Sequence, residues 1–340
     1  MNHMANKVKL AVIGCGGMAN NMHLPSIVEI ENAELVAVCD LIPEKAKAAA
    51  EKFGAPKWYT SHPEMLASEE IDGVVALVEP DRMYRVVYDC LKAGKHVLME
   101  KPAGINSYQS DSLARTAKEQ GKILAVAMNR RHIPLVQHVF KLMKELTPIT
   151  QVDGVFIKKS DIAKGWHYMD AYVSDIVHAV DLVRYLAESE PVKAATIAAR
   201  HNSPVDNAWS SVMQFENGVT GTLKANYQTA GRVHTFEIHG PNASAFINLG
   251  FGDAACEARI LKAGDGSMYS MASAGVAVPN DLTIDGIEMS GSKEYRVYYG
   301  YKQENVDFVE CILTGREPLC TIEDAAKSMH MAEYLLASAI

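Results

Sequence analysis

The feature that most constrains the fold is a glycine-rich turn, residues 14–19 (GCGGMA), which follows an apolar run from Val8 to Ile13. The turn has the form G-x-G-x-x-A and lies between a predicted strand and a predicted helix. In this context the first glycine permits a tight bend, the second lets the backbone approach a pyrophosphate, and the alanine keeps helix and strand close. The residues predicted to contact a dinucleotide here are Gly14, Gly16, Gly17, Met18 and Ala19.

An acidic residue supports this prediction. Asp40 ends a predicted strand from Leu35 to Asp40, at the place where a carboxylate can bind the 2′-hydroxyl of a ribose. A 2′-phosphate would meet like charge at Asp40, and no arginine is adjacent, so NAD is predicted in preference to NADP. The alternative is a glycine turn that binds no cofactor, with Asp40 acting as a helix cap.

The first part of the chain alternates apolar strand-like segments with helical ones, which is the pattern of βαβ units on a parallel sheet. After the first two strands, further strands are predicted at 73–78, 96–99 and 123–128, with helices at 43–53, 82–93 and 108–120. We therefore predict an α/β fold in which residues 1–128 form a Rossmann domain, a doubly wound parallel sheet of about six strands.

The pattern changes after residue 128. Helices are predicted at 134–145 and 171–186, and strands at 151–158, 192–200, 208–215, 219–227, 233–239 and 244–249, followed by closing helices at 304–314 and 322–338. Consecutive strands without intervening helices indicate a largely antiparallel sheet. We predict that residues 129–340 form an α+β substrate domain, and we expect the site in the cleft between the domains.

Composition excludes several classes of partner. The chain has 33 basic and 41 acidic residues and a net charge of -8, which argues against nucleic-acid binding. Its six cysteines form no C-x-x-C pair, and its histidines show no metal-binding pattern, so no metal is predicted. Because we find neither a signal peptide nor an apolar run long enough for a bilayer, we expect a cytoplasmic protein with a small-molecule partner and no membrane.

A lysine stands where ligands bind in open α/β folds. Glu100, Lys101 and Pro102 directly follow the strand at 96–99, at the carboxyl edge of the predicted sheet. The proline keeps Lys101 out of helical geometry, so its ammonium can project toward a ligand and steady a developing alkoxide. Taken alone, such a lysine is more often a solvated surface residue than a catalytic one.

A second set of candidates lies on the amphipathic helix at 171–186. Asp175 and His178 are three residues apart, so in an α-helix they share a face. The imidazole can accept a hydroxyl proton near neutral pH, while the carboxylate orients it or binds the substrate. Asp181 lies on the same face, but its apolar neighbours favour a packing role, and a structural role for the Asp175/His178 pair is the alternative.

Together these motifs resemble the Gfo/Idh/MocA family, that of glucose-fructose oxidoreductase and inositol dehydrogenase. The resemblance covers nearly the whole chain: the glycine turn with HLP at 23–25, AGKHVLMEKP at 93–102, NRR at 129–131, DIVHAVDLVRYL at 175–186, and ENVDFVECILTGREP at 304–318. It implies a Rossmann domain with bound NAD(P), an open-faced α+β domain, oligomerisation through the open sheet, and oxidation or reduction of sugars, inositols or their derivatives. The catalytic set that it implies is Lys101, His178 and Asp175.

Two stretches depart from the family pattern. The aspartate that commonly precedes the histidine by four residues is replaced by Ser174, and Asp175 lies three residues before His178. The usual A-T-P-N-x-x-H near the cofactor is replaced by residues 78–84 (VEPDRMY), which puts Glu79, Asp81 and Tyr84 at variant positions. These changes predict that the cofactor contacts of this segment differ from those usual in the family.

Further contacts are predicted around these groups. Glu100 and Lys101 are expected at the cofactor, and His23 is expected near the pyrophosphate. The residues predicted to contact substrate are Lys101, Arg130, Trp166, His167, Asp175 and His178. For the aromatic segment around Trp166 the alternative is loop packing, and one of Arg130 and Arg131 is expected to be structural.

We therefore expect an NAD(P)-dependent oxidoreductase that acts on a hydroxyl-bearing carbon of a sugar, polyol, inositol or glycoside, as a homodimer or homotetramer. One alternative retains NAD and uses transient oxidation of a sugar carbon for elimination or glycoside cleavage. Another is a non-catalytic NAD-binding regulatory protein. Retention of Lys101 and His178 argues against the latter.

Overall fold

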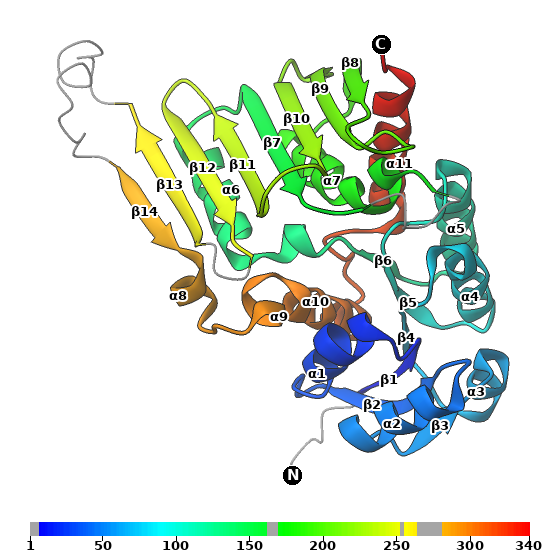
Figure 1. Ribbon diagram of the computed structural model, residues 1–340. Coiled ribbons are helices and arrows are strands. Elements are labelled where there is room, and N and C mark those ends of the chain that lie inside the picture. Colours follow the sequence, from blue (N-terminus) through cyan, green and yellow to red (C-terminus); the bar gives the residue numbers. More distant parts are fainter. Residues whose placement is uncertain (1–6, 162–168, 252–254, 264–280) are drawn as a thin grey trace. The chain divides into compact units, whose positions relative to one another are not determined.

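The computed structural model describes residues 7–161, 169–251, 255–263 and 281–340 (Figure 1). The chain divides into two compact units. The first runs to His132 and includes Gly300–Met329, and the second comprises Ile133–Tyr299 and His330–Ile340. The predicted division was a single cut after residue 128, whereas a C-terminal segment here rejoins the N-terminal unit.

The first unit contains a six-stranded parallel sheet in the order β3-β2-β1-β4-β5-β6, as in doubly wound folds. Its strands are β1 (Val8–Ile13), β2 (Ala33–Cys39), β3 (Lys57–Tyr59), β4 (Gly73–Ala76), β5 (His96–Glu100) and β6 (Leu124–Ala127). Its helices are η1 (Ala19–His23), α1 (Leu24–Ile27), α2 (Pro43–Phe53), α3 (His62–Ser68), α4 (Pro80–Lys92), α5 (Ser107–Gln120), η2 (Asn129–His132) and α10 (Tyr301–Thr314). The predicted Rossmann architecture is confirmed.

Local sequence explains the boundaries of these elements. Helix α2 begins at Pro43, whose missing N–H costs nothing in the first turn, and ends at Gly54 in the left-handed conformation. Helix α5 is capped by Asn106, whose side chain accepts a hydrogen bond from the N–H of Gln109. Strand β4 is buried at all four positions, as expected for a strand covered on both faces.

The second unit contains an eight-stranded mixed sheet in the order β14-β13-β12-β11-β7-β10-β9-β8. Its strands are β7 (Gln151–Lys158), β8 (Pro191–Ala199), β9 (Ala208–Phe215), β10 (Thr220–Asn226), β11 (Arg232–His239), β12 (Ala243–Leu249), β13 (Cys256–Lys262) and β14 (Leu282–Asp285). Its helices are α6 (Pro134–Leu146), η4 (Tyr172–Ile176), α7 (Val177–Ala187), α8 (Gly286–Ser290) and α9 (Tyr295–Tyr298), and α11 (Ile322–Ala337) spans the division between the units. All neighbouring strands are antiparallel except β7 and β10, so the predicted α+β class is confirmed.

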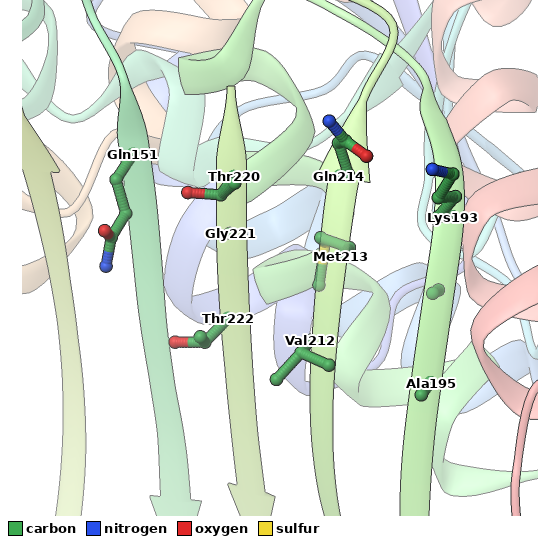
Figure 2. Close-up of a pocket in the computed structure, with 10 residues that line it drawn as sticks. Gln151, Lys193, Ala195, Val212, Met213, Gln214, Thr220, Gly221 and Thr222 are labelled. Atoms are coloured by element: carbon green, nitrogen blue, oxygen red, sulfur yellow. The ribbon is translucent and has the colours of Figure 1, made fainter. Parts of the chain in front are cut away.

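Helices α6 and α7 lie on one side of this sheet (Figure 1). Glycine at position 154 in β7 permits the approach of α7, because a Cβ there would come within 2.9 Å of the side chain of Val183. The opposite face has exposed residues at alternate positions of β9 and β10, including Val212 and Thr222. Figure 2 shows part of this face, where β7, β8, β9 and β10 line a shallow groove of about 540 Å³.

The helix predicted at 171–186 differs in one respect. It is divided into a π-helical turn, η4, and the regular helix α7. Asp175 lies in the π-turn, so the α-helical period that predicted a shared face with His178 does not apply between them. Among the described residues, none of the helices combines the length and apolarity needed to span a bilayer.

Candidate active site

The glycine turn is built into the carboxyl end of β1. Gly14 has φ +97°, and a Cβ there would lie 2.3 Å from the carbonyl oxygen of Leu77, so this position requires glycine. Its N–H donates to the carbonyl of Cys39 at 2.7 Å, which ties the turn to the end of β2. The tight bend at Gly14 is therefore required by contacts within the protein itself, with Leu77 and with Cys39.

The next glycines have a different environment. A Cβ on Gly16 would meet nothing within 4 Å, and one on Gly17 would meet only the side chain of Asn21 at 4.0 Å. The amide of Asn20 donates to the carbonyls of Cys15 and Gly16 at 2.8 and 3.0 Å. The fold therefore leaves open space beside Gly16, which fits the close approach of a ligand such as a pyrophosphate.

The last residues of the turn differ in how much of their surface is exposed to solvent. Met18 is 38% exposed, whereas Ala19 is fully buried. A small side chain at Ala19 thus serves helix packing, while Gly17 and Met18 present their surface to solvent. The burial of Ala19 agrees with the packing role that the motif predicts for it, and the cofactor contacts predicted for Gly17 and Met18 stay predictions.

Asp40 is half-buried at the end of β2. Its two carboxylate oxygens accept hydrogen bonds from the backbone N–H groups of Cys15, at 2.8 Å, and Ile42, at 2.9 Å. Each carboxylate oxygen can accept a second hydrogen bond, so the group can still receive a ribose hydroxyl. Asp40 fits a dinucleotide and also fixes the glycine turn. Leu41, which follows it, is 66% exposed and carries no charge that would attract a 2′-phosphate.

Lys101 lies at the same edge of the sheet as the glycine turn. Strand β4 pairs in parallel with both β1 and β5, with Ile13 opposite Ala76 and Ala76 opposite Met99. Two strand spacings correspond to about 10 Å. The half-buried Lys101 therefore follows the second strand from the turn, next to the point where the strand order reverses between β1 and β4.

Glu100 holds the backbone at this lysine. One of its oxygens accepts the N–H of Lys101 at 3.0 Å, and the other lies 3.2 Å from Nε2 of His23. His23 was expected near the pyrophosphate, but it has no exposed surface and lies inside the unit. The side chain of Glu100 thus contacts protein groups at both oxygens, and its predicted contact with the cofactor stays a prediction.

Sequence reasoning missed Glu304, a buried acid on α10. Its side chain is 1% exposed, Oε1 lies 3.9 Å from Nε2 of His23, and neither oxygen has a hydrogen-bond partner among the described residues. Burial, followed by the nearby charges of Glu100 and Asp307, raises the pKa of Glu304 well above 4.5. Burial therefore favours the protonated, neutral form of Glu304. The sequence marked Glu304 only as the first residue of the family motif at 304–318, because nothing local in the sequence shows that α10 contacts β5.

In the second unit, Asp175 contacts two groups that the sequence analysis also missed. Its Oδ2 accepts a hydrogen bond from the hydroxyl of Tyr227 at 2.7 Å and lies 2.5 Å from Nζ of Lys158. Lys158 ends β7, and Tyr227 follows β10, so both come from the carboxyl ends of the two parallel strands. The sequence predicted both strands but not their parallel pairing. Without that pairing, nothing indicated that Lys158 and Tyr227 lie at the same edge of the sheet.

His178 and Asp181 occupy the first turns of α7. His178 is 8% exposed and Asp181 is fully buried, which agrees with a packing role for the latter. Tyr172 in η4 donates or accepts a hydrogen bond with Ser211 at 3.1 Å and packs edge-on against Trp209. The segment that carries Asp175 and His178 is thus fixed by buried aromatic contacts.

The other predicted substrate residues have mixed outcomes. Arg130 is only 2% exposed, in η2. Its neighbour Arg131 is ion-paired with Asp324 and also donates to the carbonyl of Leu319, so Arg131 has the structural role expected for one of the pair. Trp166 and His167 lie outside the described residues, so the predictions made for them stay predictions.

The structure shows what surrounds the residues at 78–84 that differ from the family pattern. Tyr84 forms a hydrogen bond with Ser112 of α5 at 2.9 Å, which gives this side chain a structural role. Glu79 and Asp81 are exposed at the start of α4, where the positive end of the helix dipole favours acids. These two acids therefore stabilise the helix start.

Two further groups bear on the chemistry. Burial, with a smaller contribution from the charge of Asp40, raises the pKa of the Cys15 thiol in the turn to about 12, so it is not a nucleophile at neutral pH.

On the exposed sheet face, Asp153, Glu237 and His239 bring ligand atoms within 4.8 Å of one another. Asp153 is already bonded to Gln151 and Thr222, at 2.5 and 2.6 Å.

Replacing Glu304 with Gln should make stability less dependent on pH. The folded protein keeps a proton on Glu304 that the unfolded chain releases above its pKa of 4.5. Unfolding therefore releases a proton between the unfolded and the folded pKa, and the free energy of unfolding falls as pH rises through that interval. Gln cannot titrate, so Glu304→Gln should show a smaller fall in urea unfolding series between about pH 5 and pH 8. The exposed control Glu317→Gln should follow the wild type, and an unchanged slope in Glu304→Gln would contradict the assignment.

Two family models match the chain. Residues 8–128 match the family model described as an oxidoreductase family with an NAD-binding Rossmann fold, and residues 148–246 match the GFO/IDH/MocA C-terminal domain. D-apiose dehydrogenase of Paraburkholderia graminis is 27% identical over 65% of this chain and 61% of its own length. The NAD(+)-dependent scyllo-inositol 2-dehydrogenase of Bacillus subtilis is 22% identical over 96% of this chain and 93% of its own.

Solved structures share the fold. A dehydrogenase from Chromobacterium violaceum superimposes with a TM-score of 0.86 at 16% sequence identity, over 98% of this chain and 95% of its own. The two family matches lie in order along the chain and together span more than half of it. The protein is therefore a member of the Gfo/Idh/MocA family of oxidoreductases.

Proposed function

We propose that this enzyme transfers a hydride between NAD and a hydroxyl-bearing carbon of a sugar, inositol or glycoside. The observation that carries the proposal is the position of Lys101 at the carboxyl edge of the sheet, two strands from a glycine turn with open space at Gly16. The names of the relatives, which act on apiose and scyllo-inositol, support the substrate class.

The residues available to bind the cofactor are those of the glycine turn and Asp40. The turn offers backbone N–H groups at the start of a helix for the pyrophosphate, and Asp40 offers acceptors for ribose hydroxyls. The negative charge of Asp40 and the apolar Leu41 favour NAD over NADP. When bound, the nicotinamide supplies the hydride acceptor for oxidation of the substrate.

The chain's own residues would handle the proton and the charge. In the proposed mechanism the Lys101 ammonium donates a hydrogen bond to the reacting oxygen and stabilises its negative charge. His178 accepts the hydroxyl proton. Asp175, held by Lys158 and Tyr227, binds a neighbouring hydroxyl or orients the imidazole. The other residues proposed to contact substrate are Arg130, Trp166 and His167.

Replacing Lys101 with Met tests this proposal, because Met keeps the aliphatic chain and removes the ammonium. The value of kcat/KM should fall by about 10²- to 10⁴-fold, the usual contribution of such a group. Activity would be measured as NADH or NADPH formation against a panel of sugars, inositols and glycosides, with NAD expected to be the better cofactor. The exposed control Lys118→Met should retain full activity. Unchanged activity in Lys101→Met would indicate a different mechanism, and retained NAD with no net NADH would favour transient oxidation.

A pair of glycine variants tests the cofactor site. Gly16→Ala should leave the melting temperature unchanged, since a Cβ at this position would meet nothing within 4 Å, but should weaken NADH binding by at least about tenfold. Gly14→Ala should instead lower the free energy of unfolding by more than about 1 kcal/mol, because it combines positive φ with a close contact. Calorimetric titration and thermal melts separate the two effects. Normal NADH affinity in Gly16→Ala, or in Gly16→Val, would place the pyrophosphate elsewhere.

We also propose that the enzyme is a homodimer or homotetramer in the cytoplasm, where its six free thiols would stay reduced. The interface would be the open sheet face. Strand register puts Ile197, Val212, Val233 and Phe246 on this one face, and they are 60, 57, 39 and 37% exposed. Apolar side chains gathered on one exposed face are typical of an interface between proteins.

Introducing a charge on this face should separate the subunits. Val212→Glu is expected to reduce the mass measured by light scattering after size exclusion to that of a monomer, because a carboxylate would be buried in the interface. Leu313→Glu, at an apolar residue 45% exposed in the first unit, should leave the mass unchanged. A Val212→Glu protein with the wild-type oligomeric mass would exclude this face as the interface.

A further inference from the structure

A buried histidine connects the helix after the glycine turn to the residue before Lys101. His23, the last residue of η1, has no exposed surface. Its Nε2 lies 3.2 Å from Oε1 of Glu100, and the other oxygen of Glu100 accepts the N–H of Lys101 at 3.0 Å. Two hydrogen bonds therefore separate the imidazole from the backbone of the lysine.

The hydrogen bonds also indicate the direction of the contact between His23 and Glu100. Both polar atoms of the Asn305 side chain lie near Nδ1 of His23, the nitrogen at 3.1 Å and the oxygen at 3.4 Å. The nitrogen also donates to the carbonyl oxygen of Tyr301 at 2.8 Å, and its second N–H can donate to Nδ1, which is the shorter of the two contacts. With Nδ1 as an acceptor, the ring N–H at Nε2 donates to Glu100, in the direction needed to hold a carboxylate.

Helix α10 provides the other neighbours of the His23 imidazole. It contributes Asn305 and also Glu304, whose Oε1 is 3.9 Å from Nε2 of His23. Tyr301 packs edge-on against the imidazole, with ring centroids 6.3 Å apart. The ring is therefore enclosed by side chains of α10 and of β5, and it cannot turn away from Glu100 without breaking the bond to Asn305.

We propose that His23 is a positioning residue for Lys101: by donating to Glu100, it fixes the backbone from which the ammonium projects and aligns it with the glycine turn. The inference rests on the proposed function of Lys101 in catalysis. Because η1 begins directly after the turn and β5 ends directly before the lysine, this contact links the cofactor-binding segment to the catalytic one. A displacement of about 1 Å in a reacting group can lower a rate by about 100-fold.

Three substitutions at His23 separate positioning from simple stability. His23→Leu preserves bulk but removes the donor, and His23→Asn is polar but too short to reach Glu100. His23→Gln can place an amide N–H near the position of Nε2 and should rescue the function. The matched control is His62→Leu, which breaks another histidine–carboxylate contact in the same unit, 3.1 Å from Asp89, far along the sequence from Lys101.

The kinetic result expected is a loss in kcat without a loss in binding. His23→Leu and His23→Asn should lower kcat by about 10- to 100-fold while the Kd for NADH changes by less than about threefold. His23→Gln should recover most of kcat, and His62→Leu should retain it. A purely structural histidine would instead lower the melting temperature and leave kcat per folded molecule unchanged, which would overturn the proposal.

Hydrogen exchange gives a readout that does not depend on a substrate. The Lys101 N–H is bonded to Glu100, and Pro102 has no N–H, so a short peptide across this position reports on it directly. Exchange at Lys101 should be about tenfold faster in His23→Leu and His23→Asn, as expected for the loss of one hydrogen bond. Wild-type exchange in both variants would refute positioning by His23. Loss of activity in Lys101→Met together with normal kcat in these variants would refute only this inference and leave the proposed function intact.

Discussion

The parallel pairing of β4 with β1 on one side and β5 on the other is the constraint on which the first unit's site depends. In register, Ile13, Ala76 and Met99 lie in one row, so the three strands end together. The glycine turn and Lys101 therefore emerge at one edge although they are far apart in sequence. A parallel arrangement needs helical crossovers, and these helices bury the sheet so that only its edge is available for chemistry.

The groups at this edge serve the fold and the site together. Asp40 accepts one backbone N–H from the glycine turn, at Cys15, and one from Ile42, and each of its oxygens can accept a further hydrogen bond, as the proposed contact with a ribose requires. Glu100 likewise fixes the backbone of Lys101 while it receives His23. Because these carboxylates are already held before any ligand arrives, less entropy is lost on binding, which is the physical meaning of a preorganised site.

Sequence predicted the parts of the structure that depend on local pattern. The glycine turn, the bounds of α2 and the position of Lys101 after a strand all follow from neighbouring residues. Strand β3 was missed because three residues, mostly exposed, give no apolar pattern. The return of α10 to the first unit, and with it Glu304, depends on contacts between distant segments. The π-turn at Asp175 interrupts a helix whose amphipathic pattern continues through it, so periodicity could not reveal it.

The second unit shows how tertiary contacts can replace a sequence spacing. Helical period was the argument for placing Asp175 beside His178, and the π-turn removes that argument. Strand ends fix Asp175 itself: Lys158 and Tyr227, brought together by the parallel pairing of β7 and β10, hold its carboxylate by an ion pair and a hydrogen bond. The position of this carboxylate is therefore set by the sheet, and it does not require the family's usual four-residue spacing. The ammonium of Lys158 also offsets the negative charge of Asp175, so the ion pair as a whole is neutral.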